Sequence, residues 1–542
     1  MTKTDFDKTS NNQPVMNLGQ LLAHTARLFP DRVAVIQGEQ RWTWAQVDTR
    51  VNAMVRAMKS LGVRKGDKIL VQSRNNIQMF ETCWIAFRLG CVWVPTNFRL
   101  TPPEVAYLAQ SSGAVAMIVE EIFLAHIDAV TKASASLRTV ICIGAARGGE
   151  FSYESLINVN LDTQAIHLVE AVSYDDPLWF FYTSGTTGRP KAGVLTHGQM
   201  AFVVTNHLAD LIPGTTEEDC SIAVAPLSHG AGIHALLNVA RGAATVLMPS
   251  ERLEPEVFWQ LVERHRVSNL FTVPTIVKML VEDPSVDRYD HTSLRFMIYA
   301  GAPMYRADQK LALKKLGKVL VQYFGLGEVT GCITVLPPEM HSADDSDPNA
   351  NIGSCGRPRT GMEVSILDAQ SQPVKTGDIG EICCRGLGVF AGYHGNIEAT
   401  HRALKDGWFH TGDLGRLDGR GLLYITGRES DMYISGGSNV YPREVEEVLL
   451  THPAIAEVAV LGMADPKWGE VGVAVIVARE GMSGISADSV LAHLDGRCAK
   501  YRWPRHIFFW DSLPKSGYGK ITKIEVKKSL IARGEMQEIA MS

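Results

Sequence analysis

Short apolar runs rich in valine and isoleucine alternate with helical patterns along most of this chain, and this alternation constrains the fold more than any other feature. The runs "VAVIQG", "DKILVQS", "VAMIVEE" and "TVICIGA" are separated by segments with apolar residues at helical spacing. Strands that are apolar throughout are typical of sheets covered by helices on both faces. The sequence therefore predicts an α/β protein built of layered sheets and helices.

A change in pattern near Ser430 marks a domain boundary. The chain is rich in strands and turns up to Arg428, and a compact unit of helix, two strands, helix near 486–500 and a final strand follows. Pro442 suits the first turn of the first helix of that unit, and Pro453 marks its end. We expect a large N-terminal domain over residues 1–429 and a small C-terminal domain over residues 430–542.

Composition excludes several classes of function. The 542 residues carry a formal net charge of -5. The chain therefore lacks the excess of basic residues that would indicate nucleic acid or an anionic membrane surface as a partner. The nine cysteines form no CxxC pair, which predicts reduced, mostly buried thiols rather than disulfides or a zinc site. The N-terminus lacks the apolar core of a secretory signal, and no apolar stretch is long enough to span a membrane. We expect a cytoplasmic protein without integral membrane contact.

The stretch "YTSGTTGRPKAGVLTH", from Tyr182 to His197, has the chemistry of a phosphate-binding loop. An apolar strand leads into a turn whose glycines let backbone N–H groups approach an anion. Pro190 stands directly before Lys191, so this lysine does not open a helix as it would in a Walker A motif. By itself the stretch leaves two interpretations open, a loop between strands that grips phosphates and a polar surface turn. The donors of the first interpretation are Thr183, Ser184, Gly185, Thr186 and Thr187, with Lys191 as the charge.

This stretch and six others resemble, in order, the motifs of the adenylate-forming (AMP-binding) superfamily, which includes acyl-CoA synthetases, luciferases and the adenylation domains of peptide synthetases. The resemblance covers roughly residues 15–530, and the other motifs are "APLSHGAG", "YAGAPM", "QYFGLGE", "GWFHTGDL", "GRESDMYISGGSNVYPREVE" and "PKSGYGK". It implies a two-step reaction in which a carboxylate and ATP form acyl-AMP and pyrophosphate, and a thiol then displaces AMP. It also implies that the C-terminal domain is a mobile α+β domain.

The resemblance assigns the catalytic and nucleotide-binding roles residue by residue. Lys520 would bridge the carboxylate and the α-phosphate during adenylation. Asp413 would accept from the ribose hydroxyls, and Arg428 would be a second nucleotide contact. Glu328 would hold Mg2+ on the phosphates together with Thr183, since Mg2+ binds through few protein oxygens plus substrate oxygens. Adenine would lie between Phe324–Gly325 and the backbone of Gly301, Ala302 and Pro303.

The thiol and acyl sites are assigned in the same way. Gly436 and Gly437 would lie beside the pantetheine of CoA, where the lack of side chains lets a thin chain pass. His229 would gate the carboxylate end of the acyl pocket. The small residues Gly230, Ala231 and Gly232 indicate room for a bulky or extended acyl group, with residues 273–276 and 299–301 as the remaining wall.

Two positions depart from the family pattern. The usual Tyr-Gly-x-Thr-Glu is here Phe324-Gly325-Leu326-Gly327-Glu328, so a tyrosine hydroxyl and a threonine are missing. Thr330 is the conjectured replacement for that threonine. Losing one neutral hydrogen bond costs about 0.5–1.5 kcal/mol, which would slow adenylation without abolishing it. Ala192 stands where glycine is common, and we expect it to be tolerated.

The resemblance therefore predicts an ATP-dependent acyl-CoA ligase with ATP, Mg2+ and CoA as ligands and a fatty or aromatic acid as substrate. An enzyme that loads a separate acyl carrier protein is the first alternative, because it shares the first half-reaction. A nucleotide-binding protein without catalysis is the second, and the joint presence of Lys191, Glu328, Asp413, Arg428 and Lys520 argues against it. A homodimer is consistent with what is common among relatives.

Overall fold

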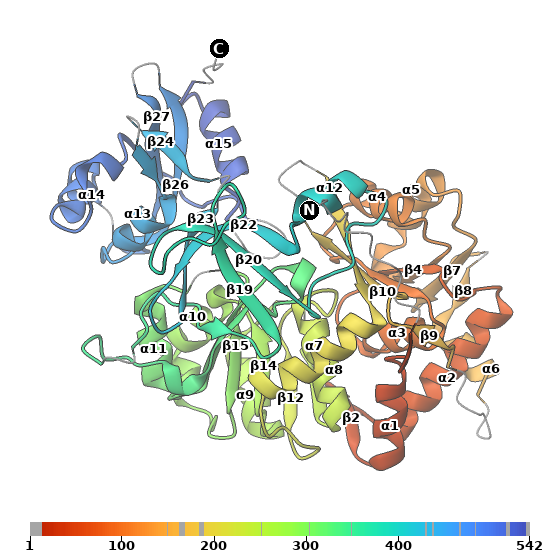
Figure 1. Ribbon diagram of the computed structural model, residues 1–542. Helices are drawn as coiled ribbons and strands as arrows, with labels where there is room; N and C mark the ends of the chain where they lie inside the picture. Colours follow the sequence, from red (N-terminus) through yellow and green to blue (C-terminus); the bar gives the residue numbers. More distant parts are fainter. Residues whose placement is uncertain are drawn as a thin grey trace.

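The fold was obtained as a computed structural model. It describes residues 13–148, 150–161, 169–183, 189–250, 252–302, 304–347, 350–428, 431–435, 438–465, 468–482, 484–515 and 521–537. The α/β class expected from the sequence is confirmed, and Figure 1 shows the helices packed around central sheets in the N-terminal part.

Within the described residues, the first central sheet has seven strands in the order β11-β10-β5-β4-β6-β7-β8. Its inner strands β4, β5, β6 and β7 are parallel, and β10 and β11 form an antiparallel pair at one end. Apolar residues such as Ile69 and Ile118 are fully buried in these strands, as expected for a sheet covered on both faces. The strands are β4 (Lys68–Gln72), β5 (Val92–Pro95), β6 (Ala116–Glu120), β7 (Thr139–Ile143), β8 (Phe151–Ser152), β10 (Pro177–Thr183) and β11 (Lys191–Thr196), and the helices connecting or flanking them are α3 (Ile77–Arg88), α4 (Pro102–Ser112), α5 (Ala125–Ala133), α6 (Tyr153–Val159) and α7 (His197–Asp210).

The second central sheet has nine strands among the described residues, in the order β18-β17-β16-β15-β14-β12-β13-β2-β3. The five strands from β16 to β13 in this order are parallel, so their carboxyl ends lie at one edge of the sheet. The strands are β2 (Val33–Gln37), β3 (Gln40–Thr43), β12 (Cys220–Ala223), β13 (Ala244–Leu247), β14 (Asn269–Thr272), β15 (Phe296–Tyr299), β16 (Leu320–Phe324), β17 (Thr334–Leu336) and β18 (Arg357–Pro358). The helices are α1 (Gln20–Leu28), α2 (Trp44–Ser60), α8 (Gly230–Arg241), α9 (Pro255–His265), α10 (Pro274–Glu282) and α11 (Arg306–Leu316).

One large apolar core joins the two sheets. In this core the ring centres of Trp93 on β5 and Trp179 on β10 lie 4.4 Å apart. Helix α8, which packs on the second sheet, adds Leu236 and Leu237 to the same core. Because burying apolar surface stabilises a fold in proportion to its area, this shared core holds the edges of the two sheets in a fixed relation.

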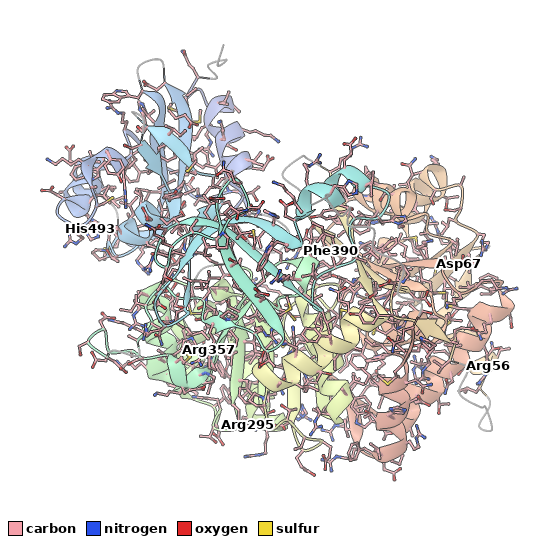
Figure 2. All side chains as sticks on the ribbon, in the orientation of Figure 1. Arg56, Asp67, Arg295, Arg357, Phe390 and His493 are labelled. Atoms are coloured by element: carbon pink, nitrogen blue, oxygen red, sulfur yellow. The ribbon has the colours of Figure 1, made fainter. Side chains whose placement is uncertain are left out.

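A third sheet lies over the junction of the first two. It contains β19 (Met362–Leu367), β20 (Gly380–Gly386), β21 (Leu404–Lys405), β22 (Trp408–Leu417) and β23 (Leu423–Arg428), with α12 (Ile397–Ala403) beside it. Phe390, labelled in Figure 2, links this sheet to the junction: its ring packs against Phe409 of β22 and its N–H donates to the carbonyl of Glu328.

Residues 391–394 form a strap along β11. Val194 N–H donates to the Gly392 carbonyl, Ala391 N–H to the Val194 carbonyl and His394 N–H to the Ala192 carbonyl. Tyr393 and Gly193 form an antiparallel bridge in the middle of this strap. The free edge of β11 is therefore paired over these residues.

The C-terminal unit, blue in Figure 1, has its own sheet and its own apolar clusters. Its α13 contacts β23 of the third sheet. Its elements are β24 (Tyr433–Ser435), β25 (Ser438–Val440), β26 (Ile455–Asp465), β27 (Gly469–Ala478), β28 (His506–Phe509), α13 (Pro442–Leu449), α14 (Ala487–Leu494) and α15 (Lys523–Ala532). A boundary near residue 430 stays a prediction.

Two local expectations have clear outcomes. The helix expected near 486–500 ends earlier, at Leu494, because Asp495 leaves the helical conformation and Gly496 has a φ of 71°. All nine cysteines are free thiols, and all except the half-buried Cys498 are buried. Among the described residues no helix is long and apolar enough to cross a membrane.

Candidate active site

The base of the β10–β11 hairpin brings the first predicted residues together. Thr183 ends β10 and lies directly opposite Lys191, which begins β11. This confirms that Lys191 follows a loop between strands rather than opening a helix. The loop residues Ser184, Gly185, Thr186 and Thr187 lie outside the described residues.

Glu328 is buried at this base and is the acceptor for two hydroxyl groups. It lies in a short 3-10 turn after β16 and is only 5% exposed. Its Oε1 accepts from the Thr183 hydroxyl at 3.0 Å and from the Tyr393 hydroxyl at 2.8 Å. Two donors on one oxygen hold the carboxylate in one orientation.

Lys191 and Glu328 both contact Tyr393, the first at the ring and the second at the hydroxyl. The ammonium of Lys191 lies 5.1 Å from the centre of the Tyr393 ring, within the range of a cation–π contact. Burial and the negative charge of Glu328 raise the pKa of Tyr393 far above its ordinary value, so this hydroxyl remains a neutral donor. Tyr393 is not among the residues predicted from the sequence, although the glycine-rich "AGYHGN" around it is a signal for a close approach of the backbone.

The residues at this base fit a magnesium ion. Within the part of the chain that the structure describes, both bonds to Glu328 use Oε1, and Oε2 accepts none. A fixed carboxylate with one oxygen available matches the preference of Mg2+ for few protein ligands plus substrate oxygens.

The packing around Gly327 matches the absence of the family's threonine at this position. A Cβ placed on Gly327 would lie 2.6 Å from Cδ1 of Phe181 and 2.9 Å from Cγ2 of Thr183. The space that a side chain at 327 would need is thus filled by β10. The conjecture that Thr330 supplies the missing hydroxyl is wrong, because Thr330 is 2% exposed and its hydroxyl donates to the Val329 carbonyl.

Asp413 and Arg428 form a second pair at the junction of the sheets. They lie opposite each other on β22 and β23, and Arg428 Nε donates to Asp413 Oδ1 at 3.1 Å. The Asp413 side chain is 8% exposed and that of Arg428 is 51% exposed. The arrangement presents a buried carboxylate next to an accessible guanidinium.

The residues expected to hold adenine follow β15 and β16. Gly301 has a φ of 82° in the turn after β15, a conformation that favours glycine, and Ala302 follows it. Phe324 ends β16 opposite Thr334 and is half-buried. At Gly325 a Cβ would lie 2.4 Å from Gly331 Cα, so this glycine is needed for close backbone packing. Pro303 lies outside the described residues.

The small residues after His229 do not provide room, which corrects the expectation for the acyl pocket. A Cβ on Gly230 would lie 2.6 Å from the Phe271 ring, and one on Gly232 would lie 2.0 Å from the Leu227 carbonyl oxygen. Tyr299, expected in the wall, is fully buried and donates to Gln322. Glycines here serve packing, and the space beside them is occupied.

Aromatic rings lie beside His229 and beside Gly230, the residue that follows it. The His229 ring lies 4.4 Å from the Phe181 ring, and the ring of Phe271 stacks on Tyr323 at 5.9 Å. Phe271 and Tyr323 are half-buried near the carboxyl ends of β14 and β16, the edge at which ligands bind in open α/β sheets.

A pocket is lined in part by residues that precede His229 in the chain. It is lined by Arg74, Arg99, Glu120 and residues 223–226, among others. Asn75 fixes one wall, since its amide donates to the Ala225 carbonyl and its side-chain oxygen accepts from Leu227 N–H. Two cations, Arg74 and Arg99, and one carboxylate, Glu120, line this pocket, and Arg74 is bonded to Glu120 at 2.9 Å, so the charges of the lining sum to a positive value.

Three further predicted residues, Gly436, Gly437 and Lys520, lie outside the described residues. Five of the others fall in two groups: Thr183, Lys191 and Glu328 are joined through direct contacts or through Tyr393, and Asp413 and Arg428 are paired.

Comparison with known proteins shows the family to which the chain is similar. Residues 22–394 match the AMP-binding enzyme family, and residues 444–520 match the C-terminal domain of AMP-binding enzymes. The chain is 34% identical to a feruloyl-CoA synthase from Amycolatopsis sp over 513 residues, which cover 94% of this chain and 98% of the relative. It is 33% identical to an indoleacetate–CoA ligase from Aromatoleum aromaticum over 523 residues, covering 96% and 100% of the two chains. Among solved structures, the anthranilate CoA ligase AuaEII in complex with anthranoyl-AMP is similar with a TM-score of 0.85 and 25% identity, covering 96% of this chain and 98% of that chain.

Proposed function

This chain belongs to the family of AMP-binding enzymes, and from that premise we propose that it is an ATP-dependent ligase that joins an aromatic carboxylic acid to coenzyme A. Enzymes of this type act on an acid and a thiol: the acid carboxylate attacks the α-phosphate of ATP, pyrophosphate leaves, and the thiol displaces AMP from acyl-AMP. The named relatives are CoA ligases, which supports CoA rather than a carrier protein as the acceptor.

The proposed roles of the residues follow from their charges and contacts. Lys191 would bind the β- and γ-phosphates, and Asp413 and Arg428 would bind the ribose. Glu328 and the Thr183 hydroxyl would hold Mg2+, which neutralises phosphate charge when bound. Lys520 would bridge the carboxylate and the α-phosphate. The fixed carboxylate of Glu328 costs no reorganisation when the charges develop, which is the main source of electrostatic catalysis.

The observation that carries the substrate class is the aromatic lining. Phe181 packs against His229, Phe271 lies beside Gly230, the next residue, and Tyr323 stacks on Phe271. Aromatic pairs gain about 0.5–1.5 kcal/mol beyond the area they bury, so a planar acyl group is favoured over a flexible chain of equal size. The names of the two curated relatives, a feruloyl-CoA synthase and an indoleacetate–CoA ligase, support the same class.

A panel of acids tests this proposal. Purified enzyme is given ATP, Mg2+ and CoA with benzoates, arylacetates, cinnamates or straight-chain fatty acids, and pyrophosphate release and thioester formation are both measured. We expect the highest kcat/KM with an aromatic acid and thioester as the product. A straight-chain acid that exceeds every aromatic acid would overturn the substrate class, and thioester formation with a holo-carrier protein but not with CoA would overturn the acceptor.

The pocket at Arg99 is proposed to take the phosphates of CoA. It lies on the loop that leads to His229, and its excess charge is positive. We expect Arg99→Ala to raise KM for CoA about 10-fold, as for one lost charge-assisted bond, with no change in KM for ATP. The matched control is Arg138→Ala, which removes an exposed ion pair with Asp67. An equal rise in KM for CoA and KM for ATP in Arg99→Ala would contradict the assignment of this pocket to CoA.

A further inference from the structure

The strand that carries Asp413 is interrupted directly at this residue. Glu381 pairs with Leu414 and Cys383 pairs with His410, so the single residue Ile382 of β20 faces three residues of β22. Such a β-bulge bends the strand and re-aims its side chains. The three residues are Thr411, Gly412 and Asp413.

Hydrogen bonds from β20 fix the shape of this bulge. Gly412 N–H donates to Glu381 Oε1 at 2.9 Å, and the Thr411 hydroxyl donates to the Ile382 carbonyl at 2.7 Å. Asp413 N–H in turn donates to the Thr411 hydroxyl at 3.0 Å. Gly412 has a φ of 71°, a conformation that other residues rarely adopt, so the bulge needs both the glycine and a partner for its N–H.

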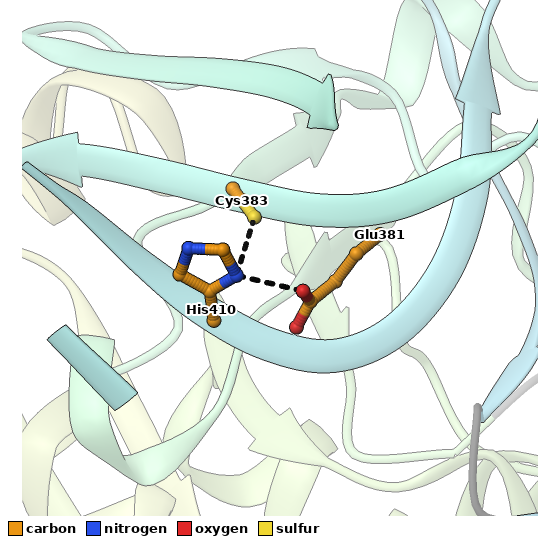
Figure 3. Close-up of side chains that lie close together, drawn as sticks. All are labelled: Glu381, Cys383 and His410. Carbon is orange, nitrogen blue, oxygen red and sulfur yellow. Dashed lines mark hydrogen bonds and ion pairs between the residues drawn. The ribbon is translucent and has the colours of Figure 1, made fainter. Parts of the chain in front are cut away.

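Glu381 is itself held in place by its second oxygen. Figure 3 shows His410 between Glu381 and Cys383, with Nδ1 lying 2.7 Å from Glu381 Oε2 and 3.4 Å from Cys383 Sγ. Burial pushes the pKa of Glu381 upward, but the bonds from His410 and from Gly412 N–H outweigh burial and leave the pKa below its ordinary value. An ionised carboxylate only accepts, so Nδ1 carries the hydrogen.

We propose that Glu381 is a positioning residue that holds the bulge 411–413 so that the Asp413 carboxylate faces the ribose of ATP. The inference rests on the proposed function, because it requires the ribose contact of Asp413. Glu381 acts through Gly412 N–H, and His410 keeps the Glu381 side chain in the orientation that this bond needs.

The same three residue types also bind zinc, and their donor atoms lie within 4.8 Å of one another. One fact favours hydrogen bonding instead: both oxygens of Glu381 already accept hydrogen bonds.

The test compares ATP with 2′,3′-dideoxy-ATP, which lacks the hydroxyls that Asp413 would bind. We expect Glu381→Ala to lower kcat/KM for ATP by about 10- to 100-fold, as for a lost bond to a charged acceptor, and to change kcat/KM for the dideoxy nucleotide less than about 3-fold. Glu381→Gln keeps an oxygen for Gly412 N–H and should recover most of the loss. Glu363→Gln, which removes an exposed ion pair with Arg385 on the neighbouring strand, is the control and should match the wild type.

Each outcome separates this inference from the proposed function. If Asp413→Ala still prefers ATP to the dideoxy nucleotide as strongly as the wild type, the ribose role of Asp413 fails and the positioning role of Glu381 falls with it, whereas the ligase reaction is judged by the acid panel. If Asp413→Ala loses the preference but Glu381→Ala slows both nucleotides equally, the positioning role alone is overturned. Where Glu381→Ala does not fold, Glu381→Asp carries the same expectation, because it keeps the charge but withdraws the carboxylate by one methylene. Zinc bound at one ion per chain, and lost in Cys383→Ser, would overturn the hydrogen-bonded arrangement.

Discussion

Restoring the family's threonine at position 327 should impair this enzyme rather than improve it. A Cβ at Gly327 would lie 2.6 Å from the Phe181 ring and 2.9 Å from Cγ2 of Thr183, both closer than real Cβ contacts. Relief of this overlap must move Phe181 or Thr183. Thr183 is the more sensitive partner, since its hydroxyl holds Glu328.

The size of the effect follows from that hydrogen bond. A bond to a charged group contributes about 1.5–3 kcal/mol. If the loss of this bond raises the activation free energy by its full amount, Gly327→Thr lowers kcat/KM for acyl-AMP formation by about 10- to 150-fold. Overpacking of this kind also costs about 1–3 kcal/mol of stability, which lowers the melting temperature without unfolding the protein at 25 °C.

Pyrophosphate release with a saturating acid, measured against ATP concentration, gives the required kcat/KM. The double variant Phe181→Leu/Gly327→Thr removes the ring atom of closest approach and should recover part of the loss, because residues in contact give non-additive effects. A Gly327→Thr enzyme with a higher kcat than the wild type would refute the reasoning, and would mean that the added hydroxyl reaches the α-phosphate in spite of the packing.

Three further predictions concern other parts of the molecule. Lys520→Ala should abolish acyl-AMP formation but leave thioester formation from synthetic acyl-AMP largely intact; an equal loss of both half-reactions would contradict alternation of the C-terminal domain. Gly232→Leu should destabilise the protein by about 1–3 kcal/mol or more in urea unfolding, because its Cβ would lie 2.0 Å from a carbonyl oxygen, and a stable enzyme with a changed acid profile would contradict this. Burial lowers the pKa of His197 to about 3 and those of His234 and His341 to about 4, so the folded state binds fewer protons than the unfolded state below pH 6.5. The free energy of unfolding should therefore fall between pH 7.5 and pH 5.5, by about 1.4 kcal/mol for each of the three, and equal urea midpoints at the two pH values would count against it.

The fold class and the hairpin at Lys191 could be predicted because local residues decide them. Alternating apolar runs and helical segments allow few architectures other than layered α/β, and Pro190 together with the β-like run "AGVLTH" after Lys191 favours a loop between strands over a helix that opens at Lys191. The loop between strands is confirmed, and the structure adds that Thr183 pairs with Lys191 at its base.

Other parts of the site depend on contacts that the sequence does not display. Tyr393 lies 65 residues from Glu328 in the chain, and only the strap along β11 brings them together. Gly230 and Gly232 have no side chain, but the sequence alone does not show whether a neighbouring residue fills the space that a side chain there would occupy. The alignment of Asp413 with Arg428 depends on the register of β22 and β23, which a bulge shifts.

The strap 391–394 also has a consequence for how the chain avoids association during folding. Without it, β11 would be an unpaired edge strand, with backbone groups able to pair with the edge of another molecule. The strap pairs with this edge, and the same residues place the Tyr393 hydroxyl against Glu328. Gly392 adopts a φ of 124° within it, and a Cβ there would lie 2.7 Å from Thr400. Substitutions at Gly392 should therefore first appear as aggregation during refolding, so solubility and a complete active site are linked through the same four residues.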